Sequence, residues 1–384
     1  GGPRCPGGLK PPGCVRDGSP RRETANDNVQ QYSSVVMLGL RLAACLLVMP
    51  LAVSACSGGG SETSGSTRRL SIATGGTGGV FYPYGGGIAK IISENIPNVE
   101  ATAEVTAASV DNLKFLKQGT SDLAFTMADT AQDAALGTDV FADFGTVPAR
   151  SLAVLYSSYV HLVTHAGSGI RRVADLRGRT ISAGSPGSGT AVLAGRILAA
   201  AGLDPQRDLR TQSLGVAQSA DALKDGKIDA FFWDGGLAAA GVVELVSTRG
   251  IEPVFISTEE LLPLLQQRHG ESLYYRAVIP KDTYSMDADV PVVAVANLLV
   301  VSEAMPEQLA YDITRLLFEK QDELAAIHPQ ARDLSLATAL TGSPVPFHPG
   351  AIRYYRERGV WTGAAGDEAA SAPHAPQGAE AGAF

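Results

Sequence analysis

Residues 116–125 read LKQGTSDLAF and residues 223–232 read LKDGKIDAFF, so a pattern of Leu-Lys, Gly, Asp and Phe occurs twice in the chain. In each copy a helix-like stretch ends at the glycine and a short apolar strand follows the aspartate. Part of this match could arise by chance at any helix–glycine–strand turn. An internal repeat explains the whole match, and we favour it because it predicts two lobes of similar design.

A glycine-rich loop precedes each copy of the pattern. Residues 74–79 read TGGTGG, residues 185–190 read SPGSGT, and each loop follows a strand-like stretch. Helical periodicity begins directly after both loops. Strands and helices that alternate in this way along most of the chain predict an α/β fold.

Loops of this kind can bind an anion. A loop that turns directly into a helix exposes unpaired backbone N–H groups, and the helix dipole adds partial positive charge. Glycine lets a ligand approach the backbone, and Ser and Thr hydroxyls add donors. The alternative is that the glycines only join strand to helix. A matched pair favours a ligand site, with candidate residues Thr74, Gly75, Gly76, Thr77, Gly78, Ser185, Gly187, Ser188, Gly189 and Thr190.

Two aromatic residues and one acidic residue extend this candidate site. Phe81 and Tyr82 open the helix after the first loop, so we expect one to line a cleft and the other to pack inward. Trp233 and Asp234 end the strand that closes the second copy, where open α/β sheets place ligands. Trp233 would then be a wall of the cleft or part of the core. Asp234 would receive a ligand ammonium group or cap the next helix.

Helix signals and composition predict the rest of the organisation. Ser109 is expected to N-cap a short helix, and Pro306 to open one long helix whose apolar stripe runs to Ile327. We expect a first lobe over residues 68–157 and a second lobe over residues 158–300. Residues 301–362 are expected to return to the first lobe, and residues 363–384 to form a disordered tail.

The N-terminal segments have the features of a bacterial lipoprotein. From Met37 a single charge, an apolar stretch and small residues lead to Cys56. We expect residues 1–36 to be a disordered extension or an over-extended translation, 37–55 a signal peptide and 56–67 a linker, with Cys56 lipidated. An uncleaved anchor is the alternative. Cleavage would leave Cys56 as the only cysteine, which excludes disulfides and cysteine-dependent catalysis.

The composition is that of a globular protein and argues against two function classes. The 384 residues are 18% charged and 45% hydrophobic, and 31 Lys and Arg stand against 39 Asp and Glu, which disfavours a nucleic-acid binder. The first loop lacks the third glycine of a dinucleotide fingerprint, and G-x-S-x-G and H-E-x-x-H do not occur. His161 and His165 are expected to be structural, and His348 to cap or pack. We therefore predict no enzyme, metal or cofactor.

Five segments together resemble the TAXI family of extracytoplasmic solute receptors, which serve tripartite ATP-independent periplasmic (TRAP) transporters: residues 70–87, 105–119, 175–190, 225–236 and 347–359. The resemblance implies a type II periplasmic-binding-protein-like fold, in which two α/β lobes enclose a ligand cleft. It also implies that Ser109 and Asn112 contact the ligand. The family usually has Gly-Gly where this chain has Ala107-Ala108, and that departure bears on the ligand more than on the fold.

The resemblance further implies a function and its partners. A receptor of this kind captures a small carboxylate, such as glutamate, glutamine or a related dicarboxylate, by lobe closure and without chemistry. It delivers the ligand to integral-membrane permease subunits. We expect a monomer held by its lipid in the periplasm or on the outer face of the cytoplasmic membrane. The alternative is a ligand-sensing adaptor lipoprotein of the same fold that takes no part in transport.

Overall fold

The computed structural model describes residues 67–361 and residue 363, which lie in one compact unit, Thr63–Phe384. The expected extension, signal peptide and Cys56 lie outside the described residues, as do nearly all of the linker and of the tail. Within the described part of the chain, no helix has the length and apolar character that crossing a membrane requires.

The two copies of the sequence pattern fold into the same supersecondary unit. In the first lobe the unit comprises β1 (Arg68–Ala73), α1 (Phe81–Asn95), β2 (Val99–Glu104), α2 (Ser109–Gln118) and β3 (Leu123–Met127). In the second lobe it comprises β5 (Thr180–Ser182), α4 (Gly189–Ala200), β6 (Arg210–Gln212), α5 (Val216–Lys224) and β7 (Ala230–Gly235). The strand orders correspond as β2-β1-β3 and β6-β5-β7, and all of these pairs are parallel.

The aspartate of each copy explains why the pattern recurs. In the first lobe the carboxylate of Asp122 accepts from the N–H of Ser71 at 2.9 Å, and the N–H of Asp122 donates to the carbonyl of Ser71 at 2.9 Å. Asp229 makes the same two bonds with Thr180, both at 2.7 Å. Each aspartate therefore fixes the start of one strand against its neighbour. The repeat predicted from the sequence is confirmed.

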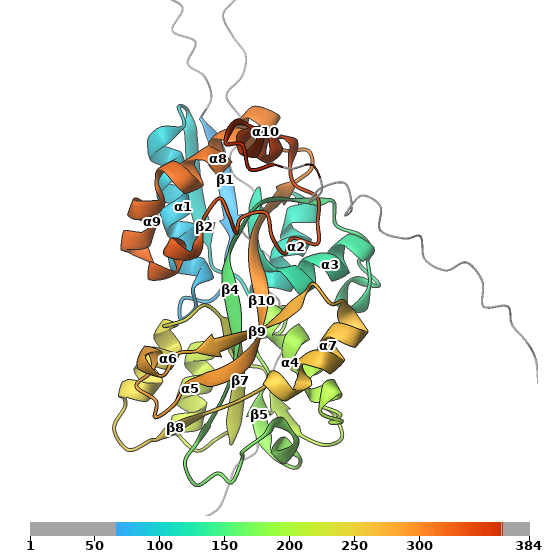
Figure 1. Ribbon diagram of the computed structural model, residues 1–384, viewed down its shortest axis with the longest axis vertical. Coiled ribbons are helices and arrows are strands. Elements are labelled where there is room, and N and C mark those ends of the chain that lie inside the picture. The colour runs from blue at the N-terminus through green and yellow to red at the C-terminus, as the bar shows by residue number, and fades with distance from the viewer. Residues whose placement is uncertain (1–66, 362, 364–384) are drawn as a thin grey trace, which may run out of the picture. The chain divides into compact units, whose positions relative to one another are not determined.

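Two long strands connect the lobes. β4 (Ala149–His165) and β10 (Val290–Ser302) pair antiparallel and run through both lobes (Figure 1). β10 pairs with β3 of the first lobe through Asn297–Val301 and with β9 (Tyr274–Ile279) through its first half. Because both strands belong to both lobes, the lobe limits expected from the sequence stay predictions.

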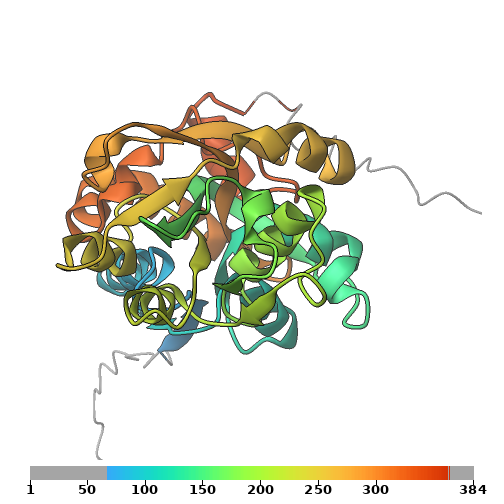
Figure 2. The same cartoon turned by 90° about the horizontal axis from the view of Figure 1, so that it is seen from below.

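Helices cover the strands of each lobe on both sides, which Figure 2 shows for the second lobe. In the first lobe α1 packs on one face with three helices from the end of the chain, α8 (Glu307–Glu319), α9 (Gln321–Ile327) and α10 (Pro349–Glu357), and α2 packs on the other with α3 (Ala128–Leu136). In the second lobe α5 and α6 (Ala240–Ser247) cover one face, and α4 and α7 (Leu262–His269) the other. The remaining strand, β8 (Pro253–Ile256), pairs with β4.

The long C-terminal helix expected from the sequence is two helices. α8 ends at Glu319, Lys320 has a non-helical φ of −110°, and α9 begins at Gln321. The break turns α9 against α1, where Leu324 and Ile327 approach Gly87. Ile327 is 41% exposed, so this contact covers it only in part and the expected apolar stripe is incompletely buried at its end.

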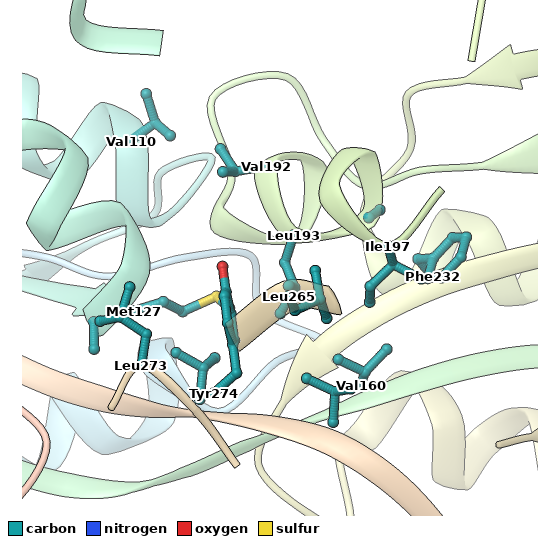
Figure 3. Close-up of a cluster of buried hydrophobic side chains, with 14 of the residues drawn as sticks. Val110, Met127, Val160, Val192, Leu193, Ile197, Phe232, Leu265, Leu273 and Tyr274 are labelled. Carbon is teal, nitrogen blue, oxygen red and sulfur yellow. The ribbon is translucent and has the colours of Figure 1, made fainter. Parts of the chain in front are cut away.

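One buried apolar cluster draws side chains from both lobes. It contains Val110 and Met127 of the first lobe together with Val192, Leu193 and Phe232 of the second (Figure 3). All five are less than 10% exposed. Apolar burial of this kind contributes about 25 cal/mol for each Å² removed from water, so it stabilises the contact between the lobes.

Candidate functional site

A cavity of about 240 Å³ lies between the lobes. Its lining comes from the first loop and α2, from the second loop and α5, and from the end of β7. Pockets for drug-sized ligands measure about 300–1,000 Å³, so this volume suits a smaller molecule. The cleft between two α/β lobes that the sequence predicted is confirmed, and with it the predicted fold class.

Four helices begin at the wall of this cavity, two from each lobe. The first residue of each of these helices lines the cavity: Phe81 of α1, Ser109 of α2, Gly189 of α4 and Val216 of α5. A helix N-terminus carries about half a positive charge, and its first N–H groups have no partner inside the helix. Three of these N–H groups are paired with other protein atoms here, those of Val110 and Asp111 in α2 and that of Ala191 in α4, and the remaining ones are available to a ligand. The cavity is therefore electropositive at four points without any basic side chain, since no Lys, Arg or His is among the described lining residues.

Most of the residues expected to bind a ligand do line the cavity. The structure brings together Gly75, Gly76, Phe81, Ser109, Ser185, Ser188, Gly189, Thr190, Trp233 and Asp234. Of the two aromatic residues after the first loop, Phe81 is the one at the cavity. Tyr82 is half-buried and takes no part in the lining.

Two polar residues of the expected site instead support its wall from behind. The Thr74 hydroxyl is fully buried and donates to the carbonyl of Glu104 at 2.5 Å. The Asn112 amide donates to the carbonyls of Ala73, Thr74 and Phe125, and its oxygen accepts from Thr106. These bonds satisfy both side chains, so neither is free to contact a ligand.

A third group of expected residues joins the lobes to each other. The carbonyl of Gly187 accepts from the N–H groups of Val110 and Asp111 at the start of α2, both at 3.1 Å. The carbonyl of Gly78 accepts from Gly241 at 3.2 Å, and Thr77 beside it is exposed. Gly187 and Gly78 therefore contact the opposite lobe, and neither they nor Thr77 line the cavity.

Several lining residues were not singled out from the sequence. Leu214–Gln218, before and within the start of α5, occupies in the repeat the place that Ala107–Asp111 occupies before and within α2. The repeat could therefore have predicted this segment. Other lining residues, Met127 and Tyr156 among them, come from buried strands, and no local motif marks them.

Ser109 does not N-cap α2, contrary to expectation. Ala108 precedes the helix with a φ of 101° and a ψ of −145°, and Ser109 is the first helical residue. The Ser109 hydroxyl oxygen accepts from the N–H of Met127 at 3.1 Å, which ties α2 to the end of β3. An alanine with positive φ is strained, and such strain gathers at functional sites.

Comparison with known proteins assigns a family. The chain matches the NMT1-like family over residues 72–359. It belongs to this family. Three solved structures of similar shape are the aliphatic sulphonate binding protein of Escherichia coli (16% identity, 76% of this chain and 79% of the other, TM-score 0.39), a putative L-cystine ABC transporter protein of Listeria monocytogenes (14%, 71% and 98%, 0.43) and a phosphonate transporter binding protein of Pseudomonas aeruginosa (12%, 69% and 79%, 0.45). These low similarities select no ligand.

The second loop of this NMT1-like protein builds the start of α4. The Ser188 hydroxyl accepts from the N–H of Ala191 at 3.1 Å, so Ser188 is the N-cap, and it donates to the carbonyl of Ser185 at 2.7 Å. The Thr190 hydroxyl oxygen accepts from the N–H of Asp234 at 3.3 Å. The loop thus fixes the end of β7 relative to the helix N-terminus.

Asp234 and Trp233, two residues of the cavity wall, carry polar groups without a partner. Asp234 does not cap the next helix, because α6 begins after Ala239 and no side chain caps it. Both carboxylate oxygens of Asp234 and the indole nitrogen of Trp233 are buried and have no hydrogen-bond partner in the protein. Burial raises the pKa of Asp234 well above its usual range, and the nearby charge of Asp129 adds to the rise. Trp233 serves both expected roles, because it lines the cavity and packs on the core.

The three histidines considered in the sequence make contacts that support the fold of this family member, as predicted. His161 is fully buried and contacts the carbonyl of Tyr159 and the hydroxyl of Tyr284, and burial lowers its pKa to about 4. His348 accepts from the N–H of Gly350 and so caps α10. His165 contacts the carbonyl of Ala166. Within residues 67–361, no group of three His, Cys, Asp or Glu side chains could hold a metal ion.

Proposed function

We propose that this protein is a solute-binding receptor that captures a small carboxylate between its lobes and delivers it to integral-membrane permease subunits. The convergence of four helix N-termini on one small cavity carries the proposal. Helix N-termini bind carboxylates and other anions through backbone N–H groups. The resemblance to the TAXI family supports a TRAP-type permease as the partner and a lipid anchor at Cys56.

The backbone donors of these helices suit the carboxylate of a small ligand better than they suit an extended anionic partner that would stay outside the cavity. Each helix N-terminus acts over about one turn, so the attraction is confined to a group inside the cavity. Trp233 also lines the cavity, and its indole N–H is buried without a hydrogen-bond partner. Carboxylate oxygens accept several such bonds at once and would satisfy donors from both lobes.

Binding proceeds by closure of the lobes. The contacts of Gly187 with the start of α2, and of Gly78 with Gly241, form only when the lobes meet. A ligand that pairs with donors on both lobes stabilises this arrangement, and the exclusion of water strengthens its hydrogen bonds. The ligand is released unchanged to the permease when the lobes part.

Thermal denaturation of the full chain tests the proposal. Small carboxylates that include L-glutamate, L-glutamine, glutarate and 2-oxoglutarate are compared with matched alcohols and primary amides that lack the anionic group. A ligand selective for the folded state adds about 2.7 kcal/mol to the free energy of unfolding at a concentration of 100 Kd. We expect a saturable rise in Tm with at least one carboxylate and none with its neutral counterpart. If no carboxylate raises the Tm, the proposal is wrong.

A further inference from the structure

The end of β7 places a carboxylate where the protein provides no partner for it. Asp234 is 5% exposed, lines the cavity and has both oxygens free of hydrogen bonds. Alternate residues of a strand share a face, so Asp234 points to the same side as Phe232, which also lines the cavity. This carboxylate is the one acidic group among the described lining residues.

The surroundings of Asp234 do not compensate its charge. Arg196 of α4, a buried cation between the lobes, is paired with Asp129, Asp133 and Asp139. Asp129 itself accepts from the Tyr274 hydroxyl at 2.9 Å, and its charge opposes ionisation of Asp234. Burying a carboxylate without a partner is unfavourable, so a site that keeps one has a use for it.

We propose that Asp234 determines the specificity of the site by accepting hydrogen bonds from a cationic nitrogen of the ligand. The inference rests on the proposed function, since the ligand carboxylate must lie at the helix N-termini. The cavity is then bipolar, with positive helix ends for the carboxylate and one buried acid for an ammonium group. A dicarboxylate without an amino group would leave Asp234 unpaired, and such a ligand is rejected.

Calorimetric titration with matched pairs of ligands tests the role of Asp234. The pairs are L-glutamate and glutarate, L-glutamine and glutaramate, and 4-aminobutanoate and butanoate, which differ in the amino group alone. We expect the amino member of any pair that binds to bind at least about tenfold more tightly. In Asp234→Asn, which keeps the shape and neutral polarity of the side chain, the preference should fall below about threefold.

The pH dependence of binding gives a second readout that needs no variant. An ammonium group requires ionised Asp234, so the affinity should rise with pH and binding should release a proton while free Asp234 is protonated. If protonated Asp234 instead donated to a second ligand carboxylate, the affinity would fall with pH. The other titratable groups are Asp129, whose charge acts on Asp234, the groups bonded in the same cluster (Asp133, Arg196 and Tyr274), and Tyr156 in the cavity wall, and they all remain in Asp234→Asn. The rise should therefore be absent from that variant.

The titrations distinguish failure of the role of Asp234 from failure of the proposed receptor function. Equal binding of both members of a pair, an affinity that falls with pH, or an undiminished preference in Asp234→Asn overturns the role of Asp234 and leaves a carboxylate receptor. If no member of any pair binds the wild-type protein, the proposed function fails and the role of Asp234 fails with it.

Discussion

Ala108, at the wall of the cavity, holds a backbone conformation that glycine adopts at far lower cost. Its φ of 101° and ψ of −145° lie near a region that is almost exclusive to glycine, which costs about 1–3 kcal/mol. The greater freedom of glycine in the unfolded chain offsets part of this strain. Ala108→Gly should therefore raise the free energy of unfolding by about 1 kcal/mol, measured by urea denaturation.

Ala107→Gly is the matched control for this prediction. Ala107 does not have a positive φ, so glycine there adds only unfolded-state entropy and should lower the free energy of unfolding by about 0.5–1 kcal/mol. Opposite signs for two neighbouring Ala→Gly substitutions would locate the strain at Ala108. If both substitutions destabilise the protein equally, Ala108 is not strained.

Ser188 illustrates how a residue at the ligand cavity also maintains the fold. Its hydroxyl caps α4, so Ser188→Ala should lower the free energy of unfolding by about 1 kcal/mol. Ser185→Ala, in the same loop, removes a hydroxyl with no such capping role and should change the stability by less than about 0.5 kcal/mol. Thermal denaturation of both variants measures the difference. Equal stability of the two would argue against the cap.

At the scale of elements, a buried ionic cluster joins α3 of the first lobe to α4 of the second. Arg196 contacts Asp133 and lies 3.0 Å from Asp139 and 3.5 Å from Asp129. Burial raises the pKa of Asp133 to about 7, and the charges of Asp129 and Asp139 add to the rise against the opposing effect of Arg196. Three carboxylates around one guanidinium group thus retain a proton near neutral pH.

This proton makes the stability of the α3–α4 contact depend on pH. The folded protein binds the proton more tightly than the unfolded chain, where the pKa is about 4. The free energy of unfolding should therefore fall as the pH rises from about 4 to about 7, by up to about 4 kcal/mol. In Asp133→Asn that decline should be smaller, measured by urea denaturation across this range. Asp143→Asn removes an exposed carboxylate and should leave the decline unchanged.

The repeat made most elements around the cavity predictable from the sequence, because the glycine and aspartate act within a few residues of the chain. Gly119 ends α2 with a φ of 71°, and Gly226 follows α5 with a φ of 68°. The roles of Thr74 and Asn112 were not predictable in this way. Their hydrogen bonds run to β2 and to β3, and spacing along the chain does not show which polar side chain turns toward such distant carbonyls.

The break between α8 and α9 also depends on a contact distant in sequence. Apolar periodicity continues across Lys320, so the pattern alone predicts one helix. α9 leaves that axis because Leu324 and Ile327 pack on the bare backbone of α1 at Gly87. Periodicity identified the buried face of each helix, whereas the partner across the fold decided where the helix ends.

At the scale of the whole described unit, the lobes meet through close backbone contacts at the start of α4. A Cβ atom on Gly189 would lie 2.5 Å from the sulfur of Met127 and 3.1 Å from the Cβ of Ser109, both in the first lobe. The first distance is shorter than real Cβ contacts and the second is tighter than most of them, so a larger residue at this position would force the first lobe to shift. Gly195, in the same helix, has open space around its Cα and offers a matched control.

Gly189→Ala should hold the lobes apart, whereas Gly195→Ala should not. The overlap makes the free energy of lobe closure less favourable by about 1–3 kcal/mol, which weakens ligand binding about 5- to 150-fold. The lobes that stay apart also enlarge the radius of gyration, which X-ray scattering measures. Gly195→Ala should bind as the wild type does and gain up to about 1 kcal/mol of stability, since alanine favours the helix. The two variants add the same methyl group to one helix, so a difference between them reports the contact with the first lobe. If both variants bind and scatter alike, closure does not require the approach of Gly189 to Ser109.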